Sequence, residues 1–209
     1  MVFDTPKDFI PKSENADIKN NNNLLFLFFE NQVLIKKEIN QITFPKIETV
    51  AKILNKMVDL RYFGDYKETK CFCAYLESKE DIVNTYSWST LRSLFDVTPT
   101  DLLSLTGRAY QITHWDKTNK FCSECGDKLL SEKKNNFKVC PSCKKHFYPK
   151  ISPAIMVLIK KNSTFLLARS PHFPSGMYSA LAGFVENGES LEDTIHREVF
   201  EEVGLYVHK

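Results

Sequence analysis

One short stretch, residues 183–205, restricts the fold and the chemistry of this chain more than any other. It carries seven acidic side chains in what the pattern predicts to be a loop followed by a helix. Ser190 and Asp193 form a capping-box pattern at the predicted helix start, and Gly204 is a typical C-terminal cap. An apolar stripe at four-residue intervals predicts that the helix packs on a sheet: Leu191, Ile195 and Val199.

Three carboxylates gather on one side of this predicted helix. Glu198 and Glu202 are one turn apart, and Glu201 lies three residues after Glu198. Like charges at these spacings each cost an isolated helix about 0.2–0.5 kcal/mol. A hard divalent ion such as Mg²⁺ reverses this penalty by taking the oxygens as ligands, and Arg197 can orient a neighbouring carboxylate through two hydrogen bonds. A solvated acidic helix face is the alternative interpretation.

Four cysteines show the spacing of a metal site. Two Cys-x-x-Cys pairs separated by fourteen residues predict a tetrahedral zinc site: Cys122, Cys125, Cys140 and Cys143. The site is structural, because four thiolates leave no open position for water. Gly126 follows the first pair, where a tight turn is needed, and residues 133–136 are expected at the tip of a hairpin. A nucleic-acid-binding ribbon is the alternative, because the segment is locally basic: Lys133, Lys134, Lys138, Lys144, Lys145 and His146.

The composition excludes several classes of protein. With 209 residues, 43% of them hydrophobic, the chain can form one large or two modest domains. Its net charge of +2 gives no bulk electrostatic case for binding nucleic acid or membranes. No apolar run reaches the length of a membrane span, and the first residues resemble neither a secretory signal nor a mitochondrial presequence. The metal-type cysteine spacing favours a reducing compartment, so we expect a cytoplasmic protein.

Changes in composition along the chain predict an α+β protein in four parts. Residues 1–23 are polar and are expected to form a disordered tail. Residues 24–119 predict a small α+β domain, and residues 120–149 form the zinc ribbon. Residues 150–209 are expected to begin an α/β/α sandwich with a mixed sheet.

Strand signals come early in the second of these parts. Apolar runs at 24–29 and 32–35 predict a β-hairpin, and residues 42–44 predict a further strand. Cys71 and Cys73 share one face of another predicted strand. Burial of both cysteines is the favoured interpretation, and a redox pair is the alternative.

Three helices are expected in the same part. Two are short, at residues 48–58 and 89–95. Thr98 is expected to cap a longer helix that has Pro99 at its first position. The buried stripe of this longer helix is Leu102, Leu105, Ala109, Ile112 and Trp115.

The last part alternates apolar runs with turn signals. Residues 154–159 predict a continuous strand, 161–163 a turn, and 165–168 the returning strand. Residues 169–178 form a loop, and residues 179–184 lead into the acidic stretch. This order is typical of the opening of a mixed sheet.

The acidic stretch resembles the Nudix box. It matches the pattern G-x5-E-x7-R-E-(aliphatic)-x-E-E-x-G-(aliphatic) at all nine specified positions: Gly183, Glu189, Arg197, Glu198, Val199, Glu201, Glu202, Gly204 and Leu205. In that family the box is a loop-helix-loop that binds Mg²⁺ or Mn²⁺ and hydrolyses a nucleoside diphosphate linked to another group.

Further features resemble the NADH pyrophosphatase branch of that family. They are Gly107-Arg108-Ala109 leading into the first cysteine pair, the ribbon itself, Tyr148-Pro149, and residues 173–183. The resemblance covers residues 24–209 and is strongest after residue 105. It implies a homodimer that cleaves NADH and NAD⁺ into nicotinamide mononucleotide and AMP. In bacterial members it also implies removal of NAD caps from RNA.

The resemblance assigns roles to individual residues. Glu189 supports the site through Arg197, and Glu202 is expected to be indispensable. Tyr148 and Phe184 match aromatic positions used against the nicotinamide end, where a flat ring recognises a flat ring; core packing is the alternative for each. The implied ligands of the divalent cations are the carbonyl of Ala182 and the carboxylates of Glu198, Glu201 and Glu202.

The sequence departs from the family after the box. Residues 151–209 are too few for a whole Nudix domain, and the family's S-Q-P-W-P-F-P-type motif is not among them. We therefore expect a fragment or truncated product, and a C-terminal peroxisomal tripeptide would lie outside it. Two alternatives stay open. One is a Nudix hydrolase for another nucleotide such as ADP-ribose or a capped RNA end, and the other is a non-catalytic zinc-ribbon binding module.

Overall fold

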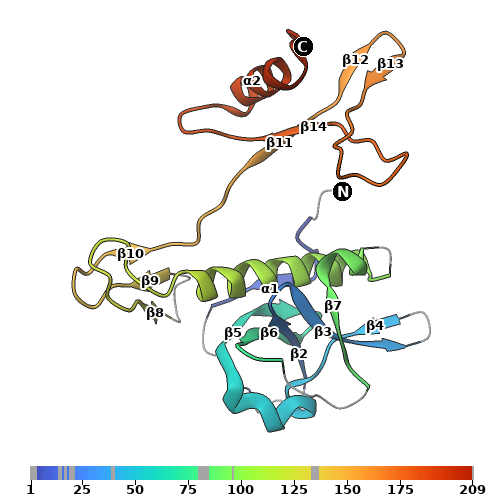
Figure 1. The fold of residues 1–209 in the computed structure, drawn as a ribbon. Coiled ribbons are helices and arrows are strands. Elements are labelled where there is room, and N and C mark those ends of the chain that lie inside the picture. Colours follow the sequence, from blue (N-terminus) through green and yellow to red (C-terminus); the bar gives the residue numbers. More distant parts are fainter. Residues whose placement is uncertain are drawn as a thin grey trace. The chain divides into compact units, whose positions relative to one another are not determined.

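A computed structural model describes residues 4–13, 16, 18, 22–38, 41–79, 85–95, 97–132 and 137–208 (Figure 1). The chain forms two compact units, Met1–Pro149 and Lys150–Lys209. Together they make a mixed α+β protein that contains a mixed sheet and a cluster of four cysteines.

Seven strands form one sheet in the described part of the first unit, in the order β1-β5-β6-β2-β3-β4, with β7 also paired to β3. Only β2 and β6 run parallel; the other pairs are antiparallel, so the sheet is mixed. The predicted hairpin is confirmed as β2 and β3, with Phe28 opposite Val33. The strands are β1 (Phe9–Pro11), β2 (Asn23–Phe29), β3 (Gln32–Glu38), β4 (Gln41–Thr43), β5 (Met57–Tyr66), β6 (Thr69–Leu76) and β7 (Ser87–Thr90).

Two helices cover opposite faces of this sheet. Because side chains alternate along a strand, β2 directs Phe26 and Phe28 to one face and Leu25 and Leu27 to the other. The first face packs against α1 (Thr100–Thr118), and the second against the 3₁₀ helix η1 (Ile47–Lys56). The apolar stripe predicted for α1 is confirmed: Leu105, Ala109 and Trp115 are buried, and Leu102 and Ile112 pack against the same core.

Several predicted local details were wrong. The helix expected at 48–58 is a 3₁₀ helix that ends at Lys56, because Val58 already pairs in β5. The helix expected at 89–95 is strand β7 followed by the short η2 (Leu91–Leu94). Thr98 does not cap α1: its hydroxyl is buried without a hydrogen bond to any described residue, and Pro99 takes the cap position.

The prediction that residues 1–23 are disordered was wrong for residues 9–11, which form the strand β1. This strand pairs with β5, and Phe9 is only 5% exposed. Its ring packs on that of Phe63, with centroids 5.8 Å apart. Gly64 makes the approach possible, because a Cβ at this position would collide with the Phe9 ring and the Ile10 carbonyl.

The cysteine-rich segment belongs to the first unit. It contains a three-stranded antiparallel sheet of β8 (Leu130–Glu132), β9 (Phe137–Val139) and β10 (His146–Phe147). The hairpin tip expected at 133–136 lies outside the described residues. Lys138 on β9 is 3% exposed and donates its Nζ protons to the carbonyls of Asp116 and Asn119, at 2.7 and 3.0 Å. The segment therefore docks on the C-terminal end of α1.

A buried charge cluster lies at this junction. The Asp116 carboxylate is fully buried and contacts Arg61 Nη2 at 3.0 Å and Lys138 Nζ at 3.5 Å. Burial raises the pKa of Asp116, while the charges of Arg61 and Lys138 act to lower it. The lysine ammonium also lies 5.2 Å from the centroid of the Trp115 ring.

The second unit is built around one helix and two strand pairs. β11 (Ala154–Val157) pairs with β14 (Leu181–Phe184), and β12 (Ile159–Lys161) pairs with β13 (Thr164–Leu166). The continuous strand predicted for 154–159 is therefore interrupted at Leu158. The helix α2 (Leu191–Val203) packs on β14 and β11.

The core of the second unit is small among its described residues. Ile155, Leu181, Thr194 and Val199 are buried, whereas Leu191 of the predicted stripe is 56% exposed. Other large apolar side chains here are also exposed: Ile151, Met156, Phe165, Phe184 and Tyr206. In the part of the chain that is described, no helix has both the length and the apolar character required to cross a membrane.

Candidate active site and metal centre

The helix α2 begins and ends as its sequence predicts. Ser190 Oγ accepts a hydrogen bond from the Asp193 N–H at 3.1 Å, and the Asp193 carboxylate accepts one from the Ser190 N–H at the same distance. This reciprocal capping box fixes the first turn. Gly204 adopts the left-handed conformation, φ +66°, that closes the helix. The caps therefore set the position of every acidic side chain between them.

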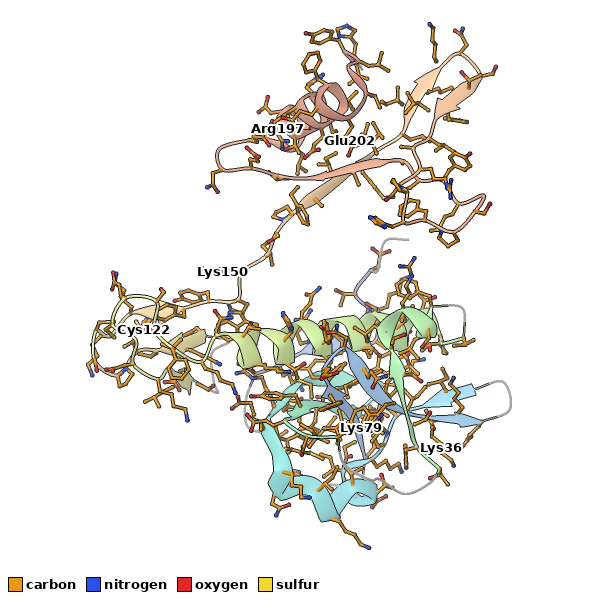
Figure 2. All side chains as sticks on the ribbon, in the orientation of Figure 1. Lys36, Lys79, Cys122, Lys150, Arg197 and Glu202 are labelled. Carbon is orange, nitrogen blue, oxygen red and sulfur yellow. The ribbon has the colours of Figure 1, made fainter. Side chains whose placement is uncertain are left out.

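Arg197 is the centre of the acidic cluster on α2 (Figure 2). Its Nε and Nη2 donate to the two oxygens of Glu189 at 2.6 and 2.9 Å, which is a bidentate contact. Its Nη1 donates to Glu198 at 3.0 Å and to Glu201 at 3.1 Å. Its Nη2 also donates to the carbonyl of Phe184, at 2.9 Å. One guanidinium thus joins the loop before the helix, the strand β14 and two helical carboxylates.

The Glu189 carboxylate is held strongly in its ionised form. Hydrogen bonds from Arg197 and from the backbone N–H of Glu186 lower the pKa of Glu189 to about 2. The hydroxyl of Thr194 adds a further bond at 3.0 Å, and sequence reasoning did not anticipate it. The contact with Glu189 in turn raises the pKa of Arg197 above its usual range. Glu189 is therefore a permanent anchor for the arginine at neutral pH.

Glycine at position 183 leaves room for the Glu198 side chain. A Cβ on Gly183 would collide with the Cγ and the carboxyl group of Glu198. Strand β14 therefore comes so close to α2 that the glutamate lies directly against the strand backbone. This contact gives a steric reason for the glycine that opens the box.

Glu202 differs from the other box carboxylates. It is exposed and makes no hydrogen bond or ion pair within the described part of the chain. Ala182, the other predicted ligand position, is exposed in β14 opposite Met156. Glu198, Glu201 and Glu202 offer the hard oxygens that Mg²⁺ prefers, so their chemistry fits such an ion. Glu198 and Glu201 both accept hydrogen bonds from Arg197. The oxygens of the three carboxylates lie further apart than the four cysteine sulfurs, which are all within 4.8 Å of one another.

The four cysteines form a group that could hold a metal ion, and it is the only such group found among the described residues. Their Sγ atoms lie 3.6 Å apart for Cys122 and Cys143, 3.4 Å for Cys125 and Cys140, and 4.0 Å for Cys125 and Cys143. A tetrahedral zinc ion with Zn–S bonds of about 2.3 Å separates its sulfurs by about 3.8 Å. The cluster therefore has the dimensions of a four-thiolate zinc site.

The two halves of this cluster have the same backbone geometry. The N–H of Gly126 donates to the Cys122 carbonyl, and that of Lys144 donates to the Cys140 carbonyl, each at 3.0 Å. Gly126 and Lys144 both have positive φ, +79° and +60°. The tight turn predicted at Gly126 is confirmed, and Lys144 makes the equivalent turn without a glycine. Backbone N–H groups, that of Cys125 foremost, lower the pKa of Cys122 to about 7. The pKa of Cys125 is raised to about 12, because the backbone hydrogen bond at Asp127 that lowers it is outweighed by burial and by contacts with the other three sulfurs.

Cys71 and Cys73 are buried, as the favoured interpretation of the sequence had it. Both lie in β6, in the core between the sheet and α1. Burial raises the pKa of Cys71 to about 12 and that of Cys73 still further. Neither thiol is therefore in the thiolate form that redox chemistry needs.

The two aromatic residues predicted to bind substrate lie in different units. Tyr148, in the first unit, is 60% exposed, and its ring lies 5.3 Å from that of Phe137. Phe184, at the end of β14 in the second unit, is 65% exposed. Neither ring is part of a described core.

Comparisons with known proteins agree with the chemistry of the site. Residues 22–115 match the family model of an NADH pyrophosphatase-like rudimentary NUDIX domain, and residues 150–209 match that of a NUDIX domain. The chain is 41% identical over 147 residues to the NAD-capped RNA hydrolase NudC of Chromobacterium violaceum. The aligned residues make up 70% of this chain and 55% of that protein. It is 42% identical over 121 residues to NudC of Stutzerimonas stutzeri, which is 58% of this chain and 44% of that protein. The chain spans about half the length of the curated relatives it matches.

Proposed function

The chain belongs to the Nudix family, in the branch of the NADH pyrophosphatases, and we propose that it hydrolyses the pyrophosphate bond of NADH and NAD⁺. The products are nicotinamide mononucleotide and AMP. The observation that carries this proposal is the arginine-centred cluster, in which Arg197 holds Glu189, Glu198 and Glu201 while Glu202 has no partner among the described residues. The cluster is built on a capped helix, which gives it a fixed frame.

The residues of the box divide into two roles in this proposal. Arg197 and Glu189 are positioning residues, because their bidentate contact joins the loop before the helix to α2. The Glu202 side chain, by contrast, is exposed. The ligands of Mg²⁺ or Mn²⁺ would be the carbonyl of Ala182 and the carboxylates of Glu198, Glu201 and Glu202. Bound divalent ions neutralise a pyrophosphate and supply a water of lowered pKa. Within the described part of the chain no partner competes for the charge of Glu202, so it is the carboxylate best able to hold the reacting water or its cation.

We extend the proposal to RNA that carries an NAD cap, because the relatives named above are NAD-capped RNA hydrolases. The cap contains the same pyrophosphate bond as free NAD. Phe184 and Tyr148 offer exposed rings on which a nicotinamide or a base could stack. The zinc of the four-cysteine cluster has a structural role in this proposal.

The architecture proposed with this function keeps the boundaries expected from the sequence. They are an N-terminal segment over residues 1–23, an N-terminal domain over 24–119, the ribbon over 120–149 and the Nudix domain over 150–209. The N-terminal segment contains the strand β1. We also propose a homodimer and a cytoplasmic location, which the metal-type use of cysteine favours.

A binding role for the ribbon alone has less support. Lys138, one of the lysines that made the segment look basic, is buried at the end of α1. Lys145 pairs with Glu124, and the Lys144 ammonium donates to the Pro141 carbonyl. Lys138 is therefore removed from the surface, and Glu124 offsets the charge of Lys145, which reduces the cationic surface available to RNA.

Product analysis tests the proposal and separates the substrates. The chain is incubated with NADH, ADP-ribose or NAD-capped RNA, each with and without Mg²⁺ or Mn²⁺, and the released AMP or the 5′-monophosphate RNA is quantified. We expect metal-dependent product from NADH and from capped RNA and less from ADP-ribose. Release of AMP from ADP-ribose alone would indicate that ADP-ribose, and not NADH, is the substrate. Salt-sensitive RNA binding without any product would favour the binding module instead.

A further inference from the structure

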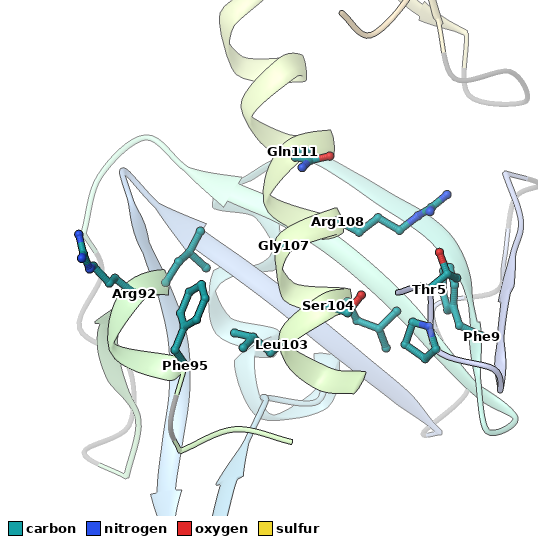
Figure 3. Close-up of a pocket in the computed structure, with 12 residues that line it drawn as sticks. Thr5, Phe9, Arg92, Phe95, Leu103, Ser104, Gly107, Arg108 and Gln111 are labelled. Carbon is teal, nitrogen blue, oxygen red and sulfur yellow. The ribbon is translucent and has the colours of Figure 1, made fainter. Parts of the chain in front are cut away.

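The first unit contains a pocket of 940 Å³ on the outer face of α1, in a part of the chain to which the proposed hydrolysis assigns no role (Figure 3). Its floor is the helix face that carries Ser104, Gly107, Arg108 and Gln111, spaced at i, i+3, i+4 and i+7. One wall comes from η2 and the residue after it. The other comes from the segment before and within β1, where Thr5, Pro6 and Phe9 lie.

Gly107 leaves the middle of this floor bare. A Cβ built there would have nothing within 4 Å, so packing among the described residues does not require a glycine. Its φ is ordinary, and no left-handed turn requires it either. A glycine in a helix interior is less stable than alanine at the same place. The open helix surface is therefore a feature that the fold of this unit leaves unexplained, and it widens the pocket.

Arg108 lines the same pocket and is partly buried. Its Nε is buried and has no hydrogen-bond partner in the described part of the chain. The guanidinium carbon lies 5.3 Å from the centroid of the Phe9 ring, and this contact holds the side chain in position. A buried N–H without a partner is unfavourable, and a bound water or ion is one of the explanations for such a group.

The lining of the pocket is cationic and apolar at once. Arg92 and Arg108 are charged, and the described residues that line it include no acidic side chain. The Ser104 hydroxyl donates to the Asp4 carbonyl, so its remaining lone pairs can accept a hydrogen bond but its proton is already used. The rest of the wall is largely apolar: Pro6, Leu91, Leu103 and Leu105.

We propose that this pocket is a second small-molecule site, and that its ligand is an organic anion with an apolar or aromatic body. The acidic group would lie on the Arg108 guanidinium, and the body would lie over Gly107 against Leu91 and Leu103. The volume is within the range of about 300–1,000 Å³ in which small-molecule sites fall. The site is independent of the Nudix box, so its existence does not depend on the proposed hydrolysis.

Two pairs of probes test the charge and the source of the ligand. AMP is compared with adenosine, and 4-phenylbutyrate with 4-phenylbutanol, so that each anion has a neutral partner with the same body. Binding to the zinc-loaded full chain, without Mg²⁺, is followed through backbone amide NMR shifts. We expect at least one of the anions to shift the signals of residues 103–111 at ligand concentrations at least tenfold below those its neutral partner needs. Binding by AMP alone would indicate a phosphate site, and binding by phenylbutyrate alone a carboxylate site.

Three variants localise the effect. Arg108→Gln removes the charge at similar length and is expected to weaken anion binding tenfold or more. Gly107→Leu fills the open floor and is expected to abolish binding while leaving the unfolding midpoint of the unit unchanged or raised. Lys52→Gln, a matched control on the exposed surface of η1, removes one charge elsewhere and should leave binding within twofold of the wild type.

Several results would overturn the proposal. One is equal binding of an anion and its neutral partner, and another is no binding of any probe. Equal effects of Arg108→Gln and Lys52→Gln would show that only net charge matters. Unfolding caused by Gly107→Leu would show that the protein itself fills this space.

Discussion

Replacement of Lys138 by methionine should destabilise the first unit far more than replacement of any surface lysine. The ammonium is buried, donates to two carbonyls at the end of α1 and lies 3.5 Å from the buried Asp116 carboxylate. Removing one partner of a buried charge pair costs about 3–5 kcal/mol, because the other charge stays in the interior. Arg61 still contacts Asp116 at 3.0 Å, so we expect a loss near the lower end, about 3 kcal/mol.

Urea denaturation followed by tryptophan fluorescence measures this loss. Both tryptophans of the chain, Trp88 and Trp115, lie in the first unit, so the signal reports its unfolding and not that of the second unit. With a denaturant slope of about 1–3 kcal/mol per molar urea, a loss of about 3 kcal/mol lowers the midpoint by about 1–3 M. Zinc content is measured in each variant, so that loss of the metal is not mistaken for loss of the ion pair.

Lys145→Met is the matched control. Both lysines lie two residues from a cysteine of the cluster, but the Lys145 side chain is 55% exposed and pairs with Glu124 at the surface. Such a pair contributes less than about 1 kcal/mol. In the double variant of Lys138→Met with Asp116→Asn, the loss should be smaller than the sum of the single losses, because the contact between the two side chains can be lost only once. A Lys138→Met variant as stable as Lys145→Met would refute the account of this junction.

Three further outcomes follow from the geometry. Gly183→Ala should displace the Glu198 carboxylate, because the added methyl group collides with it; NADH hydrolysis should fall at least tenfold, and unchanged turnover would contradict the steric argument. The Glu189 carboxyl should titrate near pH 2, so its contact with Arg197 contributes fully to stability above the ordinary pKa of 4.5 and is lost as the pH falls through about 2. In Arg197→Gln, carboxyl NMR should show the titration midpoint of Glu189 return toward 4.5. Chelation of zinc should lower the tryptophan-monitored urea midpoint, because the ribbon places Lys138 against the end of α1, and added zinc should restore it. An unchanged midpoint would show that the ribbon folds independently of the rest of the first unit.

The features predicted well from sequence are those fixed by local chemistry. Ser190, Asp193 and Gly204 define the ends of α2 through contacts within a few residues, and each has the expected partner or conformation. The cysteine spacing predicts a four-sulfur cluster because two short turns bring the thiols together. Periodicity likewise identifies the buried face of α1, since this face is continuous over four turns.

The features missed depend on contacts between distant residues. Phe9 forms a strand only because Gly64 leaves room for its ring, and neither residue carries a local signal of this contact. Lys138 looks like one more surface lysine until α1 supplies Asp116 and the carbonyl groups around it. Thr98 has the residue type of a helix cap, but the helix begins one residue later than predicted, so that Pro99 takes the cap position.

The Glu202→Gln variant tests the central claim most directly. The side chain is exposed and has no partner in the described part of the chain, so the substitution should leave the fold and the urea midpoint intact. Glu192→Gln, an exposed residue in the first turn of the same helix, is the control. We predict that Mg²⁺-dependent release of AMP from NADH falls at least a hundredfold in Glu202→Gln and stays within twofold of the wild type in Glu192→Gln. Equal turnover in both variants and the wild type would contradict the assignment of the Nudix box as the active site.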